Sequence, residues 1–163
     1  MSSIPPTQLD SSVFGLLTLH ESEIEIGGSL ERSFTLESTI NNGDKRVRVV
    51  LNPDLEWPYP TDTESQTRSL LNTAEKAHAE IQALGTDGIF ELHRSGLAQL
   101  GEYSGYDRWK ASEEQLFADW VLDSEIFFTD GFRLIYAGHP IYHIDLLLEF
   151  DREFCPTNVQ FDG

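Results

Sequence analysis

The sequence has little of three things that would define its class at once: cysteine, long apolar runs and positive charge. Its single cysteine, Cys155, excludes an intramolecular disulfide framework and fits a reducing compartment. No apolar run approaches the roughly 18–20 residues that cross a bilayer. The first ten residues carry neither the basic region nor the apolar core of a signal peptide. These absences predict a cytoplasmic protein with no membrane segment.

Positive charge is the scarcest of the three. The chain has 11 Lys and Arg against 28 Asp and Glu, which gives a net charge of −17. A surface of this sign repels the phosphates of nucleic acids and anionic membranes, so neither is expected as a partner. It attracts basic proteins, chiefly by speeding their encounter. Acidity can also serve solubility alone, and that interpretation stays open.

The acidic residues fall into three blocks that contain no Lys or Arg. Residues 1–31 hold five acids, residues 53–65 hold four and residues 112–131 hold six. Each block is interleaved with Leu, Trp, Tyr or Phe, unlike the uninterrupted charge runs of disordered tails. Each is therefore expected to form an acidic face of a folded element.

Apolar periodicity in the first two thirds of the chain predicts strands and then helices. Residues 13–52 alternate in the manner of strands, which predicts an antiparallel meander of three or four strands. Residues 63–84 carry apolar side chains at three- and four-residue steps, the pattern of an amphipathic helix, and Gly85 should end it. A second helix over 87–100 is ambiguous, and a short helix is expected over 112–122.

The last third of the sequence reads as β-structure. Asp130-Gly131 between two apolar runs predicts a hairpin, and further strands are expected over 139–150 and 157–161. We therefore predict a flexible N-terminus, 1–12, and a single α+β domain, 13–163. Antiparallel sheet from the N- and C-terminal parts should carry two or three helices from the middle on one face. Its core should include Phe14, Leu71, Ile81, Phe117, Ile135 and Leu146.

His139 and His143 are the strongest candidates for a metal or catalytic site. On a strand, residues four apart share a face but lie about 13 Å apart, too far for one metal to bind both. Pro140, Ile141 and Ile144 argue against a helix that would bring them together. The sequence also lacks G-x-S-x-G, G-x-G-x-x-G and phosphate-loop motifs. It predicts no cofactor, no metal and no enzyme, with a hydrolase using the two histidines and nearby carboxylates as the alternative.

Aromatic residues inside the acidic blocks are candidate contacts for a protein partner. Trp57 and Tyr59 stand among prolines that stiffen the backbone, and Trp120 follows Asp119. Aromatic side chains carry much of the energy of protein interfaces. The predicted partner-binding residues are Asp54, Glu56, Trp57, Tyr59, Asp62, Glu64, Glu113, Glu114, Asp119 and Trp120.

Several short motifs resemble a loose group of small bacterial domains of unknown function. They are F-G-x-L-x-L at 14–19, Asp-Arg-Trp at 107–109 before a short helix, the Asp-Gly hairpin, and Ala-Gly-His-Pro-Ile at 137–141. Members of the group often carry a Gly-His-x-Ile element, and some resemble immunity proteins encoded beside secreted toxins.

This resemblance supplies no catalytic residues. It implies a non-enzymatic protein that neutralises a cognate toxin by capping it, and a toxin with a basic surface would suit the charge. A self-associating regulatory or structural module is the remaining alternative, so a homo-oligomer is possible.

Overall fold

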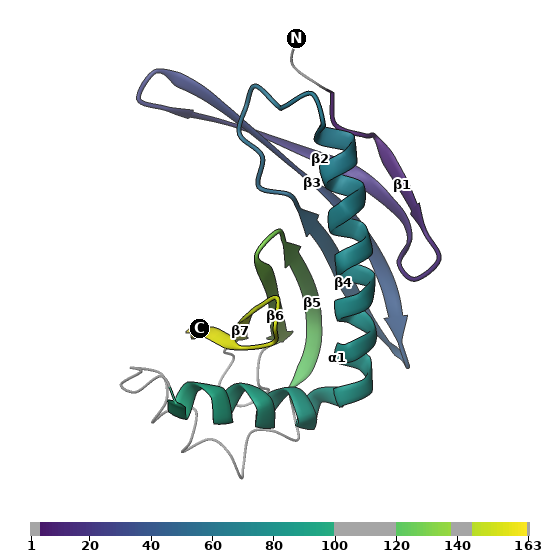
Figure 1. The fold of residues 1–163 in the computed structure, drawn as a ribbon, viewed down its shortest axis with the longest axis vertical. Helices are drawn as coiled ribbons and strands as arrows, with labels where there is room; N and C mark the ends of the chain where they lie inside the picture. The colour runs from purple at the N-terminus through teal and green to yellow at the C-terminus, as the bar shows by residue number, and fades with distance from the viewer. Residues whose placement is uncertain (1–3, 100–119, 138–144, 163) are drawn as a thin grey trace. The chain divides into compact units, whose positions relative to one another are not determined.

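The computed structural model describes residues 4–99, 120–137 and 145–162 (Figure 1). The eight strands form one sheet in the order β1 to β8. Internal contacts divide the chain into two compact units. The first is Met1–His78 with Ile126–Thr129, and the second is Ala79–Glu125 with Asp130–Gly163. The elements are β1 (Gln8–Ser11), β2 (Gly15–Ile26), β3 (Ser29–Asn42), β4 (Lys45–Asn52), α1 (Thr63–Gln99), β5 (Val121–Phe128), β6 (Gly131–Ala137), β7 (Asp145–Asp151) and β8 (Pro156–Asp162).

The predicted α+β fold with two or three helices is wrong. The described residues form one mostly β chain with a single helical segment, α1. Gly85 ends the first helical part of this segment, as predicted, with a non-helical φ of 67° and ψ of 175°, and a second helical part follows across a kink. Glycine adopts such a φ without the steric penalty of a Cβ. No helix in this part of the chain is long and apolar enough to span a bilayer.

The prediction of a short helix over 112–122 is wrong at its C-terminal end. Residues 112–119 lie outside the described residues, whereas 121 and 122 are the first residues of β5. Strand β5 ends at a two-residue turn, Thr129 and Asp130, which leads into β6 as the Asp-Gly motif predicts. The strand expected over 139–150 is present from Asp145 on as β7, whereas 139–144 lie outside the described residues, and the strand expected over 157–161 lies within β8.

The predicted meander of the first 52 residues is confirmed. Strands β1 to β4 pair consecutively and antiparallel. Residues Gln8–Ser11, which we assigned to the flexible N-terminus, form β1. Because side chains alternate along a strand, one face of the meander is buried. Its buried side chains are Leu17, Phe34, Leu36, Val47, Val49 and Leu51.

The first part of α1 packs within the first unit. Leu71, predicted to lie in the core, is buried, and so are Leu70 and Ala74. The Oγ of Ser11 donates a hydrogen bond of 2.7 Å to Oε1 of Glu75. The Phe14 ring, also buried as predicted, lies 5.2 Å from the ring of His78 in an edge arrangement. These contacts join β1 and the turn after it to the helix.

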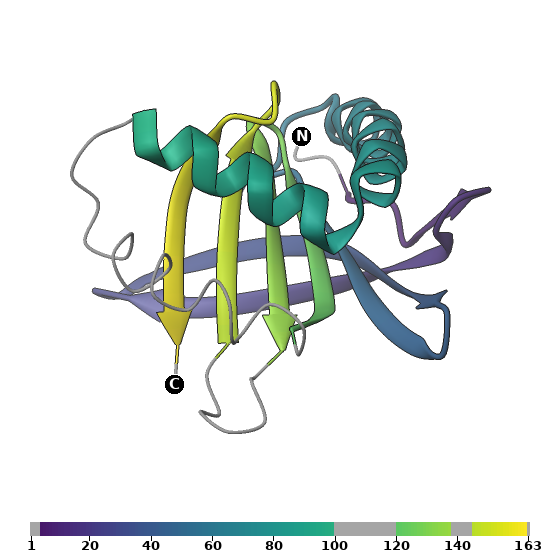
Figure 2. The same ribbon diagram turned by 90° about the horizontal axis from the view of Figure 1, so that it is seen from below.

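The second unit has its own core beneath the rest of α1, which lies across the strands of that unit (Figure 2). The Phe90 ring lies 4.8 Å from that of Tyr136, and His93 lies 4.9 Å from Phe150. Ile81 and Leu146 are buried, as predicted.

For two further residues that were predicted to lie in the core, one prediction is wrong and the other is untested. Ile135 is half-buried, because the alternation of β6 turns Phe132, Leu134 and Tyr136 inward instead. Phe117 lies outside the described residues.

Candidate functional site

Strands β2 and β3 are longer than their neighbours and form a projecting hairpin. They have 12 and 14 residues, against 8 in β4 and 4 in β1. The pairing of β3 with β4 starts at Leu36, and the pairing of β1 with β2 stops at Thr18. Residues 20–33, which we call the acidic arm, therefore extend beyond both neighbours (Figure 1). All residues from 20 to 31 are exposed.

The register of the arm places its charged and apolar side chains on different faces. Glu21, Glu23 and Glu25 follow one another on one face of β2, because successive side chains of a strand alternate. Ile24 and Ile26 lie on the opposite face, and each is 56% exposed. Gly27 and Gly28 close the hairpin with positive φ values of 58° and 82°. The arm thus presents an acidic face and an apolar face.

A proline-rich loop, residues 53–60, lies beside the arm, and we call it the Trp57 loop. The backbone N–H of Asp54 donates to Oδ1 of Asn52 at 2.9 Å, which supports the positive φ of Asp54. Loop and arm together enclose a cavity of about 380 Å³. Three predicted residues, Asp54, Glu56 and Trp57, are therefore brought together. The cavity is lined by Leu30, Glu31, Arg32, Ser33, Asp54, Leu55, Glu56 and Trp57.

A chain of ring contacts fixes Trp57 at this cavity. The guanidinium carbon of Arg32 lies 4.7 Å from the centre of the Trp57 ring. The Trp57 ring meets the Tyr59 ring edge-on at 5.3 Å, and Tyr59 meets Phe34 in the same way at 5.0 Å. On its other side, Nε of Arg32 lies 2.7 Å from Oε1 of Glu23. Arg32 therefore connects the acidic row of the arm to the exposed tryptophan.

Tyr59 packs against the Trp57 ring and is buried, and its role as a partner-binding residue stays a prediction. Its side chain is 3% exposed, and its hydroxyl has no hydrogen-bond partner among the described residues. Burial raises the pKa of the Tyr59 phenol above its ordinary value. The carboxylates of Glu21 and Glu23 raise that pKa further, whereas Arg32 lowers it. The charges of the arm thus act on the pKa of a phenol that is itself buried.

Trp120 is likewise buried, at 5% exposed, and its role as a partner-binding residue stays a prediction. When a tryptophan lies inside an acidic block, no feature of the sequence shows whether it is an interface anchor or a core residue. Large aromatic side chains are most often buried, because their burial contributes most to stability.

Asp62 and Glu64 are exposed, as predicted, but they belong to the start of α1. Oδ1 of Asp62 accepts a hydrogen bond of 2.8 Å from Nε2 of Gln66, and Oε1 of Glu64 accepts one of 2.9 Å from Nη2 of Arg68. Carboxylates in a first turn also complement the helix dipole. Neither residue lines the cavity at Trp57. Glu113, Glu114, Asp119, His139 and His143 lie outside the described residues, so their roles stay predictions.

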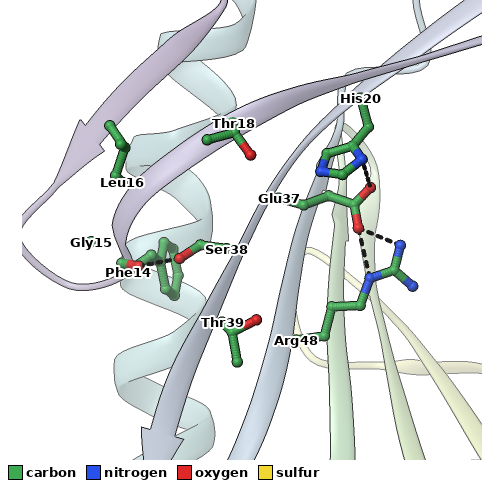
Figure 3. Close-up of a pocket in the computed structure, with 9 residues that line it drawn as sticks. All are labelled: Phe14, Gly15, Leu16, Thr18, His20, Glu37, Ser38, Thr39 and Arg48. Carbon is green, nitrogen blue, oxygen red and sulfur yellow. Dashed lines mark hydrogen bonds and ion pairs between the residues drawn. The ribbon is translucent and has the colours of Figure 1, made fainter.

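A second hollow, of about 570 Å³, lies on the sheet where β2, β3 and β4 run side by side (Figure 3). Glu37 is its centre, with a side chain that is 13% exposed. Oε1 of Glu37 accepts from Nε of Arg48 at 2.6 Å, and Oε2 accepts from the hydroxyl of Thr35 at 2.9 Å. Nδ1 of His20 lies 3.7 Å from Oε2. One carboxylate therefore links three strands.

The geometry of this hollow favours an ion-pair network over a catalytic dyad. A separation of 3.7 Å is too long for a hydrogen bond between His20 and Glu37. The nearby hydroxyl of Ser38 donates to the backbone oxygen of Phe14 at 2.6 Å, so it faces away from the histidine. Across the described ranges, no three His, Cys, Asp or Glu side chains gather as metal ligands would.

Sequence reasoning missed the charged residues of the arm as site residues. The acidic block 1–31 contains them, and the alternation of Glu with Ile before Gly-Gly indicates the strand. The sequence does not show the relative lengths of the strands. The residues of β2 and β3 give no sign that β1 and β4 end before them. Arg32, just past the end of that block, gave no signal at all.

No protein-family model, curated protein or solved structure matches the chain. The strongest candidate site within it is the acidic arm together with the Trp57 loop. These two segments carry six carboxylates, one arginine and an exposed tryptophan. That combination suits a partner with positive charge and a recess for an indole ring.

Proposed function

We propose that the protein is a non-enzymatic binding protein that holds a basic protein partner against the acidic arm and the Trp57 loop. The observation that carries this proposal is the exposed tryptophan set among the carboxylates of a projecting hairpin. Trp57 is 39% exposed, yet its ring is already held by Tyr59 and Arg32. Binding would therefore order little that is not ordered beforehand, which favours affinity.

The charges and the ring contribute to different steps of binding. The carboxylates of Asp54 and Glu56 line the cavity beside Trp57, and the net charge of the chain is −17. Such a field speeds the encounter with a cationic surface. A buried aromatic anchor chiefly slows dissociation, and as a hot spot it contributes about 2 kcal/mol or more.

An immunity protein of a bacterial toxin system is the class that suits these properties. Its task is fast and tight capping of a toxin inside the producing cell, which needs steering and anchoring and no chemistry of its own. The resemblance of several short motifs to those of small bacterial domains supports the same proposal. A cytoplasmic location and a basic-surfaced toxin, such as a nuclease, complete it.

The experiment is co-expression with the product of the neighbouring gene, followed by surface kinetics on the purified pair. A one-to-one complex is expected, and its association should slow as salt shortens the Debye length from about 10 Å at 0.1 M to about 3 Å at 1 M. Dissociation should change much less. Absence of a complex, or a complex that leaves the neighbour's toxicity intact, would contradict the proposal.

The chain offers a matched control for the location of the site. Asp54→Asn with Glu56→Gln should lower the association rate, and Trp57→Ala should raise the dissociation rate. Asp62→Asn with Glu64→Gln removes the same charge outside the cavity and should have the smaller effect on association. Equal effects of the two charge variants would mean that only net charge matters and that the partner does not contact the Trp57 loop.

A further inference from the structure

In the part of the chain that the structure describes, the outer edge of β2 has no partner strand along the acidic arm. Strand β1 pairs with β2 up to Thr18, and one more hydrogen bond runs from the N–H of Leu19 to the oxygen of Thr7 at 3.0 Å. Pro5 and Pro6 come just before Thr7, and proline has no N–H with which to continue a ladder. Among the described residues, nothing pairs with this edge from His20 to Ile26.

The backbone groups on that edge belong to the three glutamates. In an antiparallel strand, the N–H and C=O of one residue point to the same side, and the next residue points to the other side. The backbone N–H of Leu19 points toward the β1 side of β2, where it meets Thr7. The backbone groups of Glu21, Glu23 and Glu25 therefore point outward, and the N–H and C=O of each have no strand partner among the described residues. The two-residue turn agrees with this assignment. It makes Ile26 and Ser29 the hydrogen-bonded pair that closes the hairpin, so the backbone groups of Ile26 point toward β3.

A strand added to this edge would meet two different rows of side chains. On one face it would lie beside Glu21, Glu23 and Glu25, and on the other beside Ile24 and Ile26. Directly opposed side chains on neighbouring strands lie about 4.5–5.5 Å apart, and opposite charges there are favourable. The complementary strand consequently alternates basic and apolar residues.

We propose that the acidic arm binds its partner by strand addition, and that the bound segment is an extended stretch in which Lys or Arg alternates with apolar residues. This inference rests on the proposed function and names the partner's contact chemistry. A second copy of the chain is the poorer occupant, because pairing two arms through these edges would place glutamates beside glutamates. Such like-charge pairs across strands are destabilising.

The probe is a short synthetic peptide in which Lys alternates with Val, added to the full chain. Amide exchange followed by NMR gives a residue-specific readout. In the free protein the amides of Glu21, Glu23 and Glu25 should exchange fast, whereas those of Ser22 and Ile24 are paired with β3 and should be slower. The peptide should protect the three fast amides and change the other two little. A peptide with the same Lys and Val in two blocks should protect none of them.

Two variants separate the backbone contribution from the charge. Glu23→Pro removes one outward N–H and leaves the pairing with β3 possible, since proline is tolerated on a free edge. Glu23→Gln removes the same charge and keeps the N–H. We expect Glu23→Gln to weaken peptide binding by roughly two- to fivefold, the range for one opposed charge pair. Glu23→Pro should weaken it by roughly a further two- to twelvefold, because it also removes a hydrogen bond.

The outcomes distinguish this inference from the proposed function. If the neighbouring gene's product forms the complex while the three outward amides stay unprotected, strand addition is wrong and the proposed function stands. Equal binding of the alternating and blocked peptides also contradicts strand addition. Dimers of the free chain that protect the same amides would mean that the edge serves self-association instead.

Discussion

The guanidinium of Arg32 stacks over the Trp57 ring, with its carbon 4.7 Å from the ring centre. This contact joins two segments that are 25 residues apart in the chain, as 57 − 32 shows. A cation over an indole ring contributes about 0.5–1 kcal/mol at an exposed site. Arg32 and Trp57 thus hold the arm and the Trp57 loop to one another.

A double-mutant cycle should measure that contact. Arg32→Ala and Trp57→Ala are each expected to lower the free energy of unfolding, and the double variant should lower it by less than the sum. The coupling should be about 0.5–1 kcal/mol, from urea unfolding of all four proteins. A coupling near zero would mean that the arm and the loop are held by other contacts.

Removing the hydroxyl of Tyr59 should leave stability unchanged or raise it. The hydroxyl is buried without a partner among the described residues, so Tyr59→Phe removes an unsatisfied group and should stabilise by up to about 1 kcal/mol. Tyr136→Phe is the control, because the Tyr136 hydroxyl has a side-chain hydrogen bond with Thr86. Its loss should destabilise by about 1 kcal/mol. A costly Tyr59→Phe would show that its hydroxyl bonds to another group.

His93 should make the protein sensitive to acid. Its side chain is 0% exposed, and Nε2 donates to the backbone oxygen of Asn158 at 2.9 Å. Burial lowers the pKa of His93 from 6.5 to about 4, although the backbone groups of Asn158 and Glu149 act in the opposite direction. The folded state therefore binds the proton more weakly than the unfolded state does. The resulting stability is complete above about pH 6.5 and is lost as the pH falls toward about 4.

The comparison with His93→Gln tests this linkage, because the titration of the carboxylates is common to both proteins. The glutamine cannot be protonated in this range, so it avoids the cost of charging a buried ring. The advantage of the wild type in free energy of unfolding should shrink by about 3 kcal/mol between pH 7 and pH 4. A constant difference across that range would show that His93 binds its proton equally well in the folded and unfolded states, so that burial does not lower its pKa.

Gly131 should tolerate no side chain. A Cβ at this position would lie 2.0 Å from the backbone oxygen of Phe150, where β6 meets β7. Gly131→Ala must displace the backbone and should cost about 3 kcal/mol in the free energy of unfolding. Gly43→Ala is the control, since it has a positive φ of 67° but nothing within 4 Å of the added atom. Its cost should be about 1–2 kcal/mol, and a larger loss there than at Gly131 would contradict the close approach.

Local chemistry in the sequence was enough to predict the strands, because alternation and turn residues act over a few positions. The Asp130-Gly131 hairpin and the buried Leu71 and Leu146 follow from such patterns. The number of helices did not follow, because no local pattern shows that the helical parts before and after Gly85 meet at a kink within one segment. Whether Tyr59 is exposed depends on Phe34, a residue of another strand, so no local pattern could decide it.

The candidate site was predictable only in part for the same reason. Asp54, Glu56 and Trp57 are close together in sequence, and their grouping required only a stiff loop. Arg32 reaches them through the register of β3, which depends on its pairing with β2. The reach of the arm is a difference in length between strands, so it appears only when the whole sheet is assembled.

The early stop of β1 has a consequence for how the free protein behaves at high concentration. An exposed strand edge with isoleucines on one side is a template for runaway cross-β assembly of identical chains. The row of Glu21, Glu23 and Glu25 makes each such template repel its copies, so the edge stays available without seeding fibres. The same three side chains would then keep the free protein from aggregating and leave its strand edge open to a strand of another protein.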